Sequence, residues 1–560
     1  MPALERFDLD PTKTVSDAEI ERRWTEFRRA SASNPLRRRA QSLLSEESAR
    51  ARLARRALAP LTSRRRRRRL SNVGQRALGA TTFPSNYNAN GVAASRDAVA
   101  NPRRHDVLVV VIDEFSTSPD YLVDTLNETL SSTSAVWLML LDARHDAYAR
   151  DEALDVLVAA ARDEDDVVFA DEPGPDPSTP VLKPRTVGPH TLMSYNVVGR
   201  PALLRVSTMR AIEGFNLNVA WAFEHDAYLR LQERGAVFHH VARVLRAGRT
   251  PDAFHPSRSD EGTLAATSAA LVRRQWRGRV DIGAVAGVSR WSVDPPSPAP
   301  SIDIIIPTRD RVELLRTCIE SVERRTTYPN YRIIILDNDS REPETLRYFA
   351  TSPHQVVACP GPFNYAKIVN RGVHHASGEF VVTLNNDTVV LTPSWLEQMV
   401  GLAALRDVGV VGVSLIEPDG RHEHDGFVIA PYPQHLRAGV NYYANDQFIN
   451  SVRDVCAVTG AVQMIERAWW QSLHGMDEEL RVVMNDVDLC LRSELEGRHV
   501  VFTPDVELVH AAGSSRGDLD PLTDRNRFIR RWDIFGTFRD PYLPESLELR
   551  GEHFHYREPS

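Results

Sequence analysis

The sequence predicts an α/β protein with two open, Rossmann-like domains in tandem, each built on a mostly parallel sheet. Apolar strand patterns alternate with helical patterns from His105 to about residue 280 and again from Ile302, which is typical of βα units. The 560 residues also exceed the size of one domain several times. We therefore expect an arginine-rich arm at 1–100, domains at 101–285 and 301–545, a linker at 286–300 and a tail at 546–560.

The amino-terminal arm is defined by its charge. Between Leu36 and Ala80 there are 14 arginines against Glu46 and Glu47, a net charge of about +12 in a chain whose total is -7. Such a tract suits an anionic surface, either membrane phospholipid or nucleic acid, and is equally consistent with a solvated helical or disordered arm. We expect peripheral contact with an anionic membrane and no nucleic acid.

Composition excludes several classes of protein. No apolar run approaches the roughly 18 residues of a membrane-spanning helix, and no signal peptide is recognised. Neither a P-loop motif nor a GxGxxG dinucleotide motif follows a predicted strand. The four cysteines lie far apart without CxxC spacing, which argues against a disulfide framework or a structural zinc site and favours the cytoplasm; they are Cys318, Cys359, Cys456 and Cys490.

The expected linker is rich in proline. The stretch "VDPPSPAPS", Val293 to Ser301, holds four prolines in six residues. Proline fixes the backbone and cannot donate a ladder hydrogen bond, so we expect a stiff connection rather than a helix or a central strand.

Three strands of the second domain are predicted to end in polar residues. "IDIIIP" begins at Ile302 and is followed by Thr308, "YRIIILDNDS" ends in the polar residues from Asp337, and the strand Phe380–Leu384 runs into "NND". In open parallel sheets ligands bind beyond the carboxyl ends of the strands, so Thr308, Asp337 and Asp387 are expected to line one crevice.

The "NND" segment has two interpretations. Asp387 is a hard oxygen ligand suited to Mg²⁺ or Mn²⁺ on a diphosphate, and Asn385 and Asn386 can hydrogen-bond a sugar or phosphate without adding charge. Alternatively, the segment makes an Asx-type turn with no other role.

A later stretch supplies candidates for acid–base chemistry. Asp486 and Asp488 lie where a loop enters a helix, so Asp488 is expected to be an N-terminal helix carboxylate and Asp486 to face the cleft as a general base. His510 closes the strand "VELVH", and an imidazole beside Asp387 would complete a mixed oxygen and nitrogen site that favours Mn²⁺.

The motifs of residues 301–535 resemble family 2 glycosyltransferases with the GT-A fold. The segments that carry the resemblance are "SIDIIIPTRDRVELLRTCIESVERRTTYPNYRIIILDNDS", "PGPFNYAKIVNRGVHHASGEFVVTLNNDTVVLTPSWLEQMV" and "MDEELRVVMNDVDLCLR" with "VVFTPDVELVHAAGSSRG". They are similar in particular to bacterial rhamnosyl- and galactofuranosyltransferase-like enzymes of surface polysaccharide synthesis.

The resemblance implies a role for each candidate residue. Thr308 and Arg309 would contact the nucleotide, Asp337 would read its base, and Asn385 with Asn386 would line the donor site. Asp387 would be the last position of a DxD-like metal motif whose first acid is replaced by Asn385. His510 would share the metal and Asp486 would be the catalytic base; the residues so assigned are Thr308, Arg309, Asp337, Asn385, Asn386, Asp387, Asp486 and His510.

The first domain resembles a degenerate copy of the second. Its metal motif is blurred around Asp142, Arg144 and Asp146, and Ala247 stands where a second ligand histidine is expected. Carboxylates remain in its base region, at positions 224 and 226. A structural or acceptor-positioning role is therefore expected for this domain.

The predicted function is inverting, metal-dependent transfer of a sugar from a nucleotide-diphosphate sugar to a glycan acceptor, including a lipid-linked one, at the inner face of the cell membrane. One alternative is a metal-dependent sugar nucleotidyltransferase, which would release pyrophosphate. The other is a non-catalytic protein that binds a membrane or nucleic acid through the arginine-rich arm.

Overall fold

A computed structural model of the chain describes residues 106–112, 118–142, 147–172, 180–245, 260–437, 446–511, 521–550 and 553–556, together with Glu19 and Arg22. Apart from those two residues, the predicted arginine-rich arm lies outside the described residues. In the part of the chain that is described, no helix combines the length and the apolar character needed to cross a membrane.

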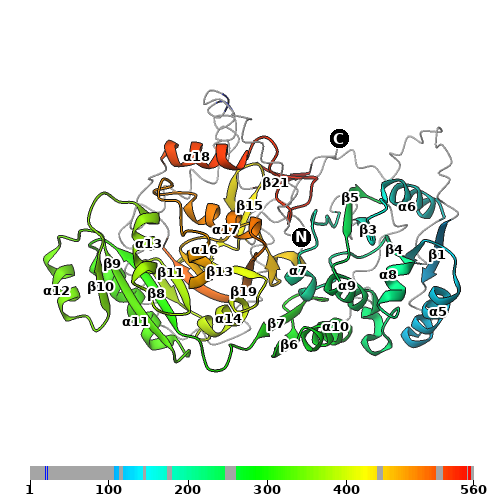
Figure 1. The fold of residues 1–560 in the computed structure, drawn as a ribbon, viewed down its shortest axis with the longest axis horizontal. Coiled ribbons are helices and arrows are strands. Elements are labelled where there is room, and N and C mark those ends of the chain that lie inside the picture. The colour runs from blue at the N-terminus through cyan, green and yellow to red at the C-terminus, as the bar shows by residue number, and fades with distance from the viewer. Residues whose placement is uncertain are drawn as a thin grey trace.

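The first unit, residues 106–273, contains a five-stranded sheet in the order β1-β2-β4-β3-β5 (Figure 1). Its strands are β1 (Val107–Ile112), β2 (Trp137–Asp142), β3 (Val167–Asp171), β4 (Ala202–Arg205) and β5 (Phe238–Val244). Its helices are α5 (Pro119–Ser132), α6 (Ala147–Ala160), α7 (Pro189–Ser194), α8 (Val206–Ala211), the 3-10 helix η2 (Leu217–Ala222), α9 (Phe223–Glu233) and α10 (Asp260–Arg273).

The second unit, residues 302–556, is built on a ten-stranded sheet in which eight strands follow the order β10-β9-β8-β11-β18-β13-β19-β12, with β14 on β13 and β17 on β19. The strands are β8 (Ile302–Thr308), β9 (Tyr331–Asp337), β10 (Gln355–Ala358), β11 (Phe380–Leu384), β12 (Thr388–Val390), β13 (Val408–Ile416), β14 (His422–His424), β17 (Arg453–Asp454), β18 (Val462–Glu466) and β19 (His499–His510).

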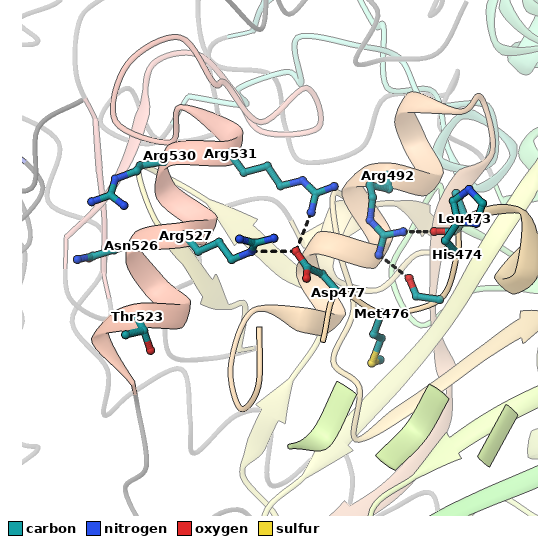
Figure 2. Close-up of a pocket in the computed structure, with 11 residues that line it drawn as sticks. Leu473, His474, Met476, Asp477, Arg492, Thr523, Asn526, Arg527, Arg530 and Arg531 are labelled. Atoms are coloured by element: carbon teal, nitrogen blue, oxygen red, sulfur yellow. Dashed lines mark hydrogen bonds and ion pairs between the residues drawn. The ribbon is translucent and has the colours of Figure 1, made fainter. Parts of the chain in front are cut away.

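Eight helices and two small hairpins complete the described part of the second unit. The helices are α11 (Val312–Arg325), α12 (Pro343–Thr351), α13 (Tyr365–His375), α14 (Trp395–Ala403), α15 (Asp446–Ile449), α16 (Arg467–Ser472), α17 (Asn485–Leu495) and α18 (Leu522–Trp532). The hairpins pair β15 (Phe427–Ile429) with β16 (Pro433–His435) and β20 (Leu547–Arg550) with β21 (His553–Tyr556). Helices α17 and α18 face each other across a cavity rich in arginine (Figure 2).

The α/β class is confirmed, and most strands along each sheet run in one direction, but antiparallel strands are inserted among them. Strands β10, β9, β8 and β11 are parallel neighbours, whereas β18 runs antiparallel to both β11 and β13. In the first unit β4 is antiparallel to β2 and β3. The chain between β13 and β18 makes short strands instead of one crossover helix, so β18 enters the sheet from the opposite end.

The parallel strands read as continuous apolar runs because both faces of the sheet are covered. Ile304 and Ile306 of β8 pack in one buried cluster with α11, while Ile305 packs in another with α13. The predicted strand Phe380–Leu384 is β11, and all five of its residues are buried. Helix packing on both faces thus fixes the strands whose ends carry the candidate site.

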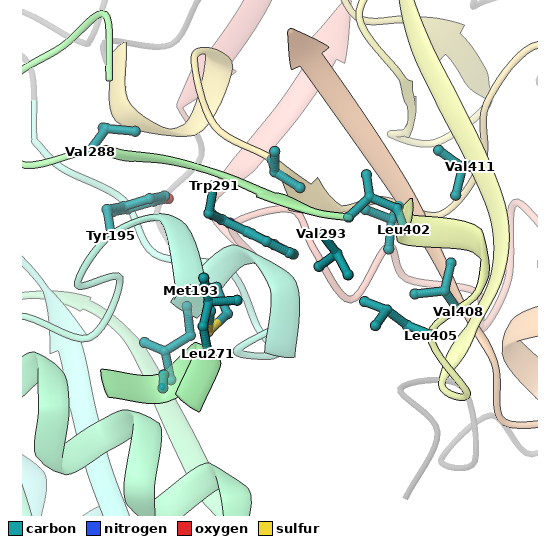
Figure 3. Packing of buried hydrophobic residues seen from close by; sticks show 14 of the residues in the cluster. Met193, Tyr195, Leu271, Val288, Trp291, Val293, Leu402, Leu405, Val408 and Val411 are labelled. Atoms are coloured by element: carbon teal, nitrogen blue, oxygen red, sulfur yellow. The ribbon is translucent and has the colours of Figure 1, made fainter. Parts of the chain in front are cut away.

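The segment 286–300 is not simply a linker. Strand β7 (Ser289–Val293) pairs with β6 (Gly278–Ile282), and Trp291 of β7 is buried between residues of the two units, including Met193 and Val408 (Figure 3). Burial of this large aromatic side chain stabilises the folded chain, whereas the same side chain in an exposed linker would not. The proline-rich residues after Val293 form no helix or strand, as predicted.

A buried polar contact also joins the units. Asp454 of β17 accepts hydrogen bonds from the backbone N–H groups of His190 and Thr191 in the first turn of α7, at 2.9 and 2.8 Å. His190 Nδ1 lies 2.7 Å from Asp454 Oδ1, and both side chains are fully buried. Burial raises the pKa of Asp454, but His190 and the hydrogen bonds outweigh it and lower the pKa to about 2.

Candidate functional site

The predicted strand ends meet in the structure. Thr308 at the end of β8 lies opposite Asp337 at the end of β9 in the parallel register. Asn386 Nδ2 donates to Thr308 Oγ1 at 2.9 Å, which ties the residues after β11 to the same edge of the sheet. Asp337 Oδ1 accepts from the backbone N–H of Ser340 at 2.9 Å and remains partly exposed.

Arg309 stands apart from this cluster. It follows Thr308 directly, and its side chain is exposed. The position is consistent with contact to a ligand at the strand ends, and its assignment stays a prediction.

Asp387 and His510 lie together, as the sequence predicted. Strand β12 pairs antiparallel with β19, and Thr388 is the register partner of His510. Asp387 Oδ1 is 3.3 Å from His510 Nε2, and both side chains are almost completely buried. Two residues 123 positions apart in the chain are thereby brought to one point by a single strand pairing.

The turn interpretation of "NND" is also partly correct. The Asn385 carbonyl accepts from Thr388 Oγ1 at 2.8 Å, which closes a turn after β11. Asn385 Nδ2 lies 3.4 Å from His510 Nε2. The turn therefore places Asp387 beside His510, so the turn interpretation and the ligand interpretation of this segment do not exclude each other.

Glu423 is a member of the site that sequence reasoning missed. Its Oε2 lies 2.7 Å from His510 Nδ1, and the side chain is buried. Burial lowers the pKa of His510, but its hydrogen bonds to Asp387 and Glu423 outweigh this effect and raise the pKa to about 10. The run "HEHD" at 422–425 was the available signal, because charged residues concentrated in a buried strand rarely serve packing alone.

Asp486 lies in the first turn of α17 and is partly exposed. Its Oδ2 accepts the backbone N–H of Gly460 at 2.8 Å, and its Oδ1 accepts its neighbour's N–H at 2.9 Å. Ala461, next to Gly460, accepts a backbone hydrogen bond from Asn385 at 3.0 Å. A short backbone path therefore links the carboxylate of Asp486 to the turn that holds Asp387.

The structure gives Asp486 and Asp488 different surroundings. Asp488 is fully buried, with Arg492 Nε at 2.8 Å and Trp532 Nε1 at 3.0 Å from its oxygens. A carboxylate held by these donors anchors the helix. Asp486 is the one of the two that a substrate hydroxyl can reach.

The donor atoms at Asp387 and His510 fit a divalent cation. Two ligands about 2.1 Å from one cation and at right angles to each other lie about 3 Å apart, close to the separation of Asp387 Oδ1 and His510 Nε2. Glu423 on Nδ1 fixes the imidazole orientation, as carboxylates behind ligand histidines commonly do. The described residues contain no cluster of three or more His, Cys, Asp or Glu side chains with metal-binding geometry, so diphosphate oxygens and water would complete the coordination.

In the first unit, the carboxylates of the predicted base region, Glu224 and Asp226, form ion pairs with arginines. Glu224 pairs with Arg200, with Oε2 2.6 Å from Nη2, and both side chains are buried. Asp226 is bonded to Arg230 and Arg273 at 2.7 and 3.0 Å. The predicted metal-motif residues Arg144 and Asp146 and the predicted position of Ala247 lie outside the described residues.

Two curated proteins are similar to most of the chain. Protein y4gI of Sinorhizobium fredii is 32% identical over 391 residues, which are 65% of this chain and 43% of that protein. The O-antigen biosynthesis protein RfbC of Myxococcus xanthus is 30% identical over 412 residues, 68% of this chain and 31% of that protein. The chain thus spans less than half the length of either relative.

Two solved glycosyltransferase structures show weaker likeness. The mannosyltransferase PcManGT from Pyrobaculum calidifontis, in complex with GDP-Man and Mn²⁺, has 18% identity and a TM-score of 0.30, covering 44% of this chain and 64% of that one. GalNAc-T7 with UDP, GalNAc and Mn²⁺ has 15% identity and a TM-score of 0.33, covering 39% and 45%.

The family comparison falls on the segment that holds the strand ends. Residues 303–461 match the family model described as glycosyl transferase family 2. This range includes β8, β9, β11 and the "NND" turn, and it ends at Ala461 beside the backbone contact to Asp486. Over residues 303–461 the chain is similar to glycosyl transferase family 2.

Proposed function

We propose that the second unit transfers a sugar from a nucleotide-diphosphate sugar to a glycan acceptor, with inversion at the anomeric carbon. The observation that carries this proposal is the 3.3 Å contact between Asp387 and His510 at the strand ends of a family 2 domain. Asp486 supports it, because its carboxylate accepts two backbone N–H groups and keeps further lone pairs for a substrate proton.

The reaction is a single displacement. The Asp486 carboxylate takes the proton of an acceptor hydroxyl, the oxygen forms a bond to the anomeric carbon, and the bond from that carbon to the diphosphate oxygen breaks with its electron pair on the leaving group. Asp387 and His510 would hold Mn²⁺ or Mg²⁺. When bound, such a cation stabilises negative charge on the departing diphosphate.

The strand-end residues would bind the nucleotide. Asp337 is partly exposed beside Thr308, where it can accept hydrogen bonds from a base, and Arg309 can reach a phosphate. Thr308 and Asn386 hold each other, so they position backbone groups at the crevice. Asn385 lies between this crevice and His510.

The wider role we propose is synthesis of a surface polysaccharide on a glycan acceptor, including a lipid-linked one. The similarity to an O-antigen biosynthesis protein supports this proposal. We further propose that the chain works in the cytoplasm at the inner face of the membrane, with its arginine-rich arm on anionic lipid.

A thermal-shift screen of UDP, GDP and dTDP, each with and without Mn²⁺, tests the donor site, because a ligand that binds the folded chain raises its melting temperature. We expect one nucleotide to stabilise the chain only with the cation, and the Asp387→Asn and His510→Gln variants to lose that response. Turnover of the matching sugar nucleotide should release a nucleoside diphosphate. Release of pyrophosphate would identify a nucleotidyltransferase and contradict the proposal.

A further inference from the structure

Tyr365 is a buried tyrosine that the proposed reaction does not use. It is the first residue of α13, and its side chain lies among apolar residues with only 5% of the residue exposed. Its hydroxyl donates a hydrogen bond to the Gly460 carbonyl at 2.8 Å. The backbone N–H of Gly460 in turn donates to Asp486 Oδ2, also at 2.8 Å. One glycine therefore stands between the tyrosine hydroxyl and the carboxylate of the proposed base.

The hydroxyl and the carboxylate border the same space over Gly460. A Cβ built on this glycine would lie 3.4 Å from the Tyr365 hydroxyl oxygen and 3.5 Å from Asp486 Oδ2. Both polar groups thus lie against one short backbone segment, and a shift of that segment changes the position of the carboxylate.

Helix α13 also holds the loop that leads into α17. The backbone N–H of Tyr365 donates to the Arg481 carbonyl at 2.6 Å, five residues before Asp486. Asn364, the N-cap of α13, donates through its Nδ2 to the Glu478 carbonyl at 2.8 Å. Tyr365 therefore contacts the surroundings of Asp486 from two sides, through its backbone and through its hydroxyl.

Packing of the helix does not require a hydroxyl at this position. Asn127 of α5 and Asn370 of α13 each exchange two hydrogen bonds with the backbone of the loop before α9 or α17. Five residues before these asparagines stand Leu122 in α5 and Tyr365 in α13, and both are buried. The first unit thus fills the position with an apolar side chain. The hydroxyl occurs in the unit whose base-region acid is partly exposed.

The Gly460 carbonyl does not depend on Tyr365 alone for a hydrogen bond. Thr383 Oγ1 donates to the same oxygen at 2.9 Å, so this buried carbonyl keeps a donor when the tyrosine hydroxyl is removed. A carbonyl oxygen has two lone pairs, and a donor on each restricts its direction more than one donor does. Removal of the hydroxyl therefore loosens Gly460 without leaving a buried polar group unsatisfied.

We propose that Tyr365 is a positioning residue for Asp486. This rests on the proposed glycosyl transfer, in which Asp486 takes the proton of the acceptor hydroxyl. The Tyr365 hydroxyl fixes Gly460, and the Gly460 N–H fixes one oxygen of the carboxylate. Since a displacement of about 1 Å near a reacting group can lower a rate by a factor of about 10², a hydrogen bond that holds the base contributes measurably to kcat.

The variant Tyr365→Phe removes only the hydroxyl and tests this role in the full chain. Activity is the Mn²⁺-dependent release of nucleoside diphosphate from UDP-glucose, GDP-mannose or dTDP-glucose with water as the acceptor. We expect Tyr365→Phe to lower kcat roughly tenfold and to leave the donor KM and the nucleotide Kd unchanged, because the hydroxyl acts on the base and not on the donor. Tyr228→Phe is the matched control. Tyr228 donates to the Gly199 carbonyl of the first unit at 3.4 Å, and its change should leave kcat unaltered.

The double variant Tyr365→Phe/Asp486→Asn shows whether the tyrosine acts through the base. We expect it to be no slower than Asp486→Asn alone, because a group that only places the carboxylate has no further effect once the carboxylate is gone. A tyrosine with a general structural role would lower kcat in both backgrounds. Amide hydrogen exchange of the peptide that contains Gly460, measured by mass spectrometry, needs no donor sugar and should be faster in Tyr365→Phe than in the wild type.

Each outcome decides the proposal. Wild-type kcat in Tyr365→Phe, a tenfold loss that persists in the Asp486→Asn background, or unchanged exchange at Gly460 would overturn it. A raised nucleotide Kd in Tyr365→Phe would assign the tyrosine to the donor site and overturn it as well. Failure of the proposed function gives a different result: Asp486→Asn would keep its turnover, or the wild type would bind none of UDP, GDP and dTDP with Mn²⁺.

Discussion

Helices α9 and α17 begin alike and then use their carboxylates differently. In α9 Asp226 pairs with Arg230 one turn later, at 2.7 Å, and in α17 Asp488 pairs with Arg492 at the same spacing and 2.8 Å. Both aspartates are fully buried. The two helices differ at the acid two positions before this aspartate, which is Glu224 in α9 and Asp486 in α17.

The loops before these helices are also held in the same way. Asn127 of α5 exchanges two hydrogen bonds with the backbone of Phe215, at 2.9 and 2.8 Å. Asn370 of α13 exchanges two with the backbone of Met476, both at 2.9 Å. These shared contacts support the proposal that the first unit is a degenerate copy of the second.

The acid at this position has different surroundings in the two units. Glu224 is buried and locked to Arg200, whereas Asp486 is partly exposed and receives backbone N–H groups. An ion-paired, buried carboxylate cannot accept a substrate proton without breaking its pair. Helix α9 thus shares a buried aspartate–arginine pair with α17, while its other acid, Glu224, is held in a buried ion pair.

The largest effect on kcat is expected when Asp486, rather than Glu224, is replaced. Asp486→Asn should lower kcat by a factor of about 10² or more with little change in nucleotide binding, because it removes only the proton acceptor. Transfer measured at saturating donor, with nucleotide Kd determined in parallel, checks this. Near wild-type turnover would remove Asp486 from the base role.

Glu224→Gln is the matched change in the first unit. It should leave kcat within about threefold but lower the free energy of unfolding by about 3 kcal/mol, since Arg200 would keep a buried charge without its counter-ion. Denaturant unfolding measures the loss. A fall in kcat as large as that of Asp486→Asn, in a protein that remains folded, would make the first unit catalytic.

The next effect concerns one histidine in each unit that contacts a carboxylate, His510 in the second unit and His240 in the first. Glu423→Gln should weaken Mn²⁺ binding by about 10- to 100-fold, because Glu423 orients His510. Asp171 lies 2.9 Å from His240 in the first unit, so Asp171→Asn is a matched control that should not change Mn²⁺ affinity. Mn²⁺ paramagnetic resonance measures free cation directly. Equal affinities in the two variants would contradict a role for Glu423 at the cation.

The sequence was sufficient to predict those features that depend on local patterns. The apolar run Phe380–Leu384 gives β11, and Thr308 and Asp337 fall at the ends of neighbouring strands because parallel strands align their carboxyl ends. The pairing of Asp387 with His510 followed from the family resemblance, since nothing in the intervening residues specifies that β12 pairs with β19.

Other features were beyond sequence reasoning because they depend on long-range packing. Strand direction in the sheet depends on how the chain between β13 and β18 returns, which no periodicity encodes. Trp291 sits within a stretch predicted as linker, and only the two surfaces that it joins make it buried. Glu423 likewise gains its role from contact with a residue 87 positions away.

A smaller effect is expected from crowding the proposed base. A Cβ at Gly460 would lie 3.2 Å from the Cβ of Asp486 and 3.4 Å from the Tyr365 hydroxyl. Gly460→Ala should shift Asp486 by a few tenths of an ångström and lower kcat about tenfold, less than its removal does. Steady-state kinetics with a circular dichroism check for folding measures this. Unchanged kcat would show that the position of Asp486 tolerates more displacement than a general base should.

The smallest effect concerns a largely buried histidine of the second unit that lies against the first. His499 of β19 lies 3.5 Å from Glu494 and beside His190 of the first unit. Burial lowers the pKa of His499, but Glu494, with Asp454 and Asp407, raises it from 6.5 to about 9. Because the folded pKa exceeds the unfolded value, the stabilisation is complete below pH 6.5 and is lost as the pH rises through 9.

We therefore expect His499 to contribute about 1–3 kcal/mol of the fall in the free energy of unfolding over this alkaline window, in addition to the contribution of His510, whose pKa is also raised. The acid limb is separate: Asp454 has a depressed pKa of about 2, so its stabilisation is present above pH 3.8 and lost as the pH falls through 2. His499→Gln should flatten only the alkaline limb of denaturant unfolding measured against pH. If the variant keeps the full alkaline loss, the protonated His499 does not contribute this stabilisation and its contacts with Glu494 and Asp454 are energetically neutral.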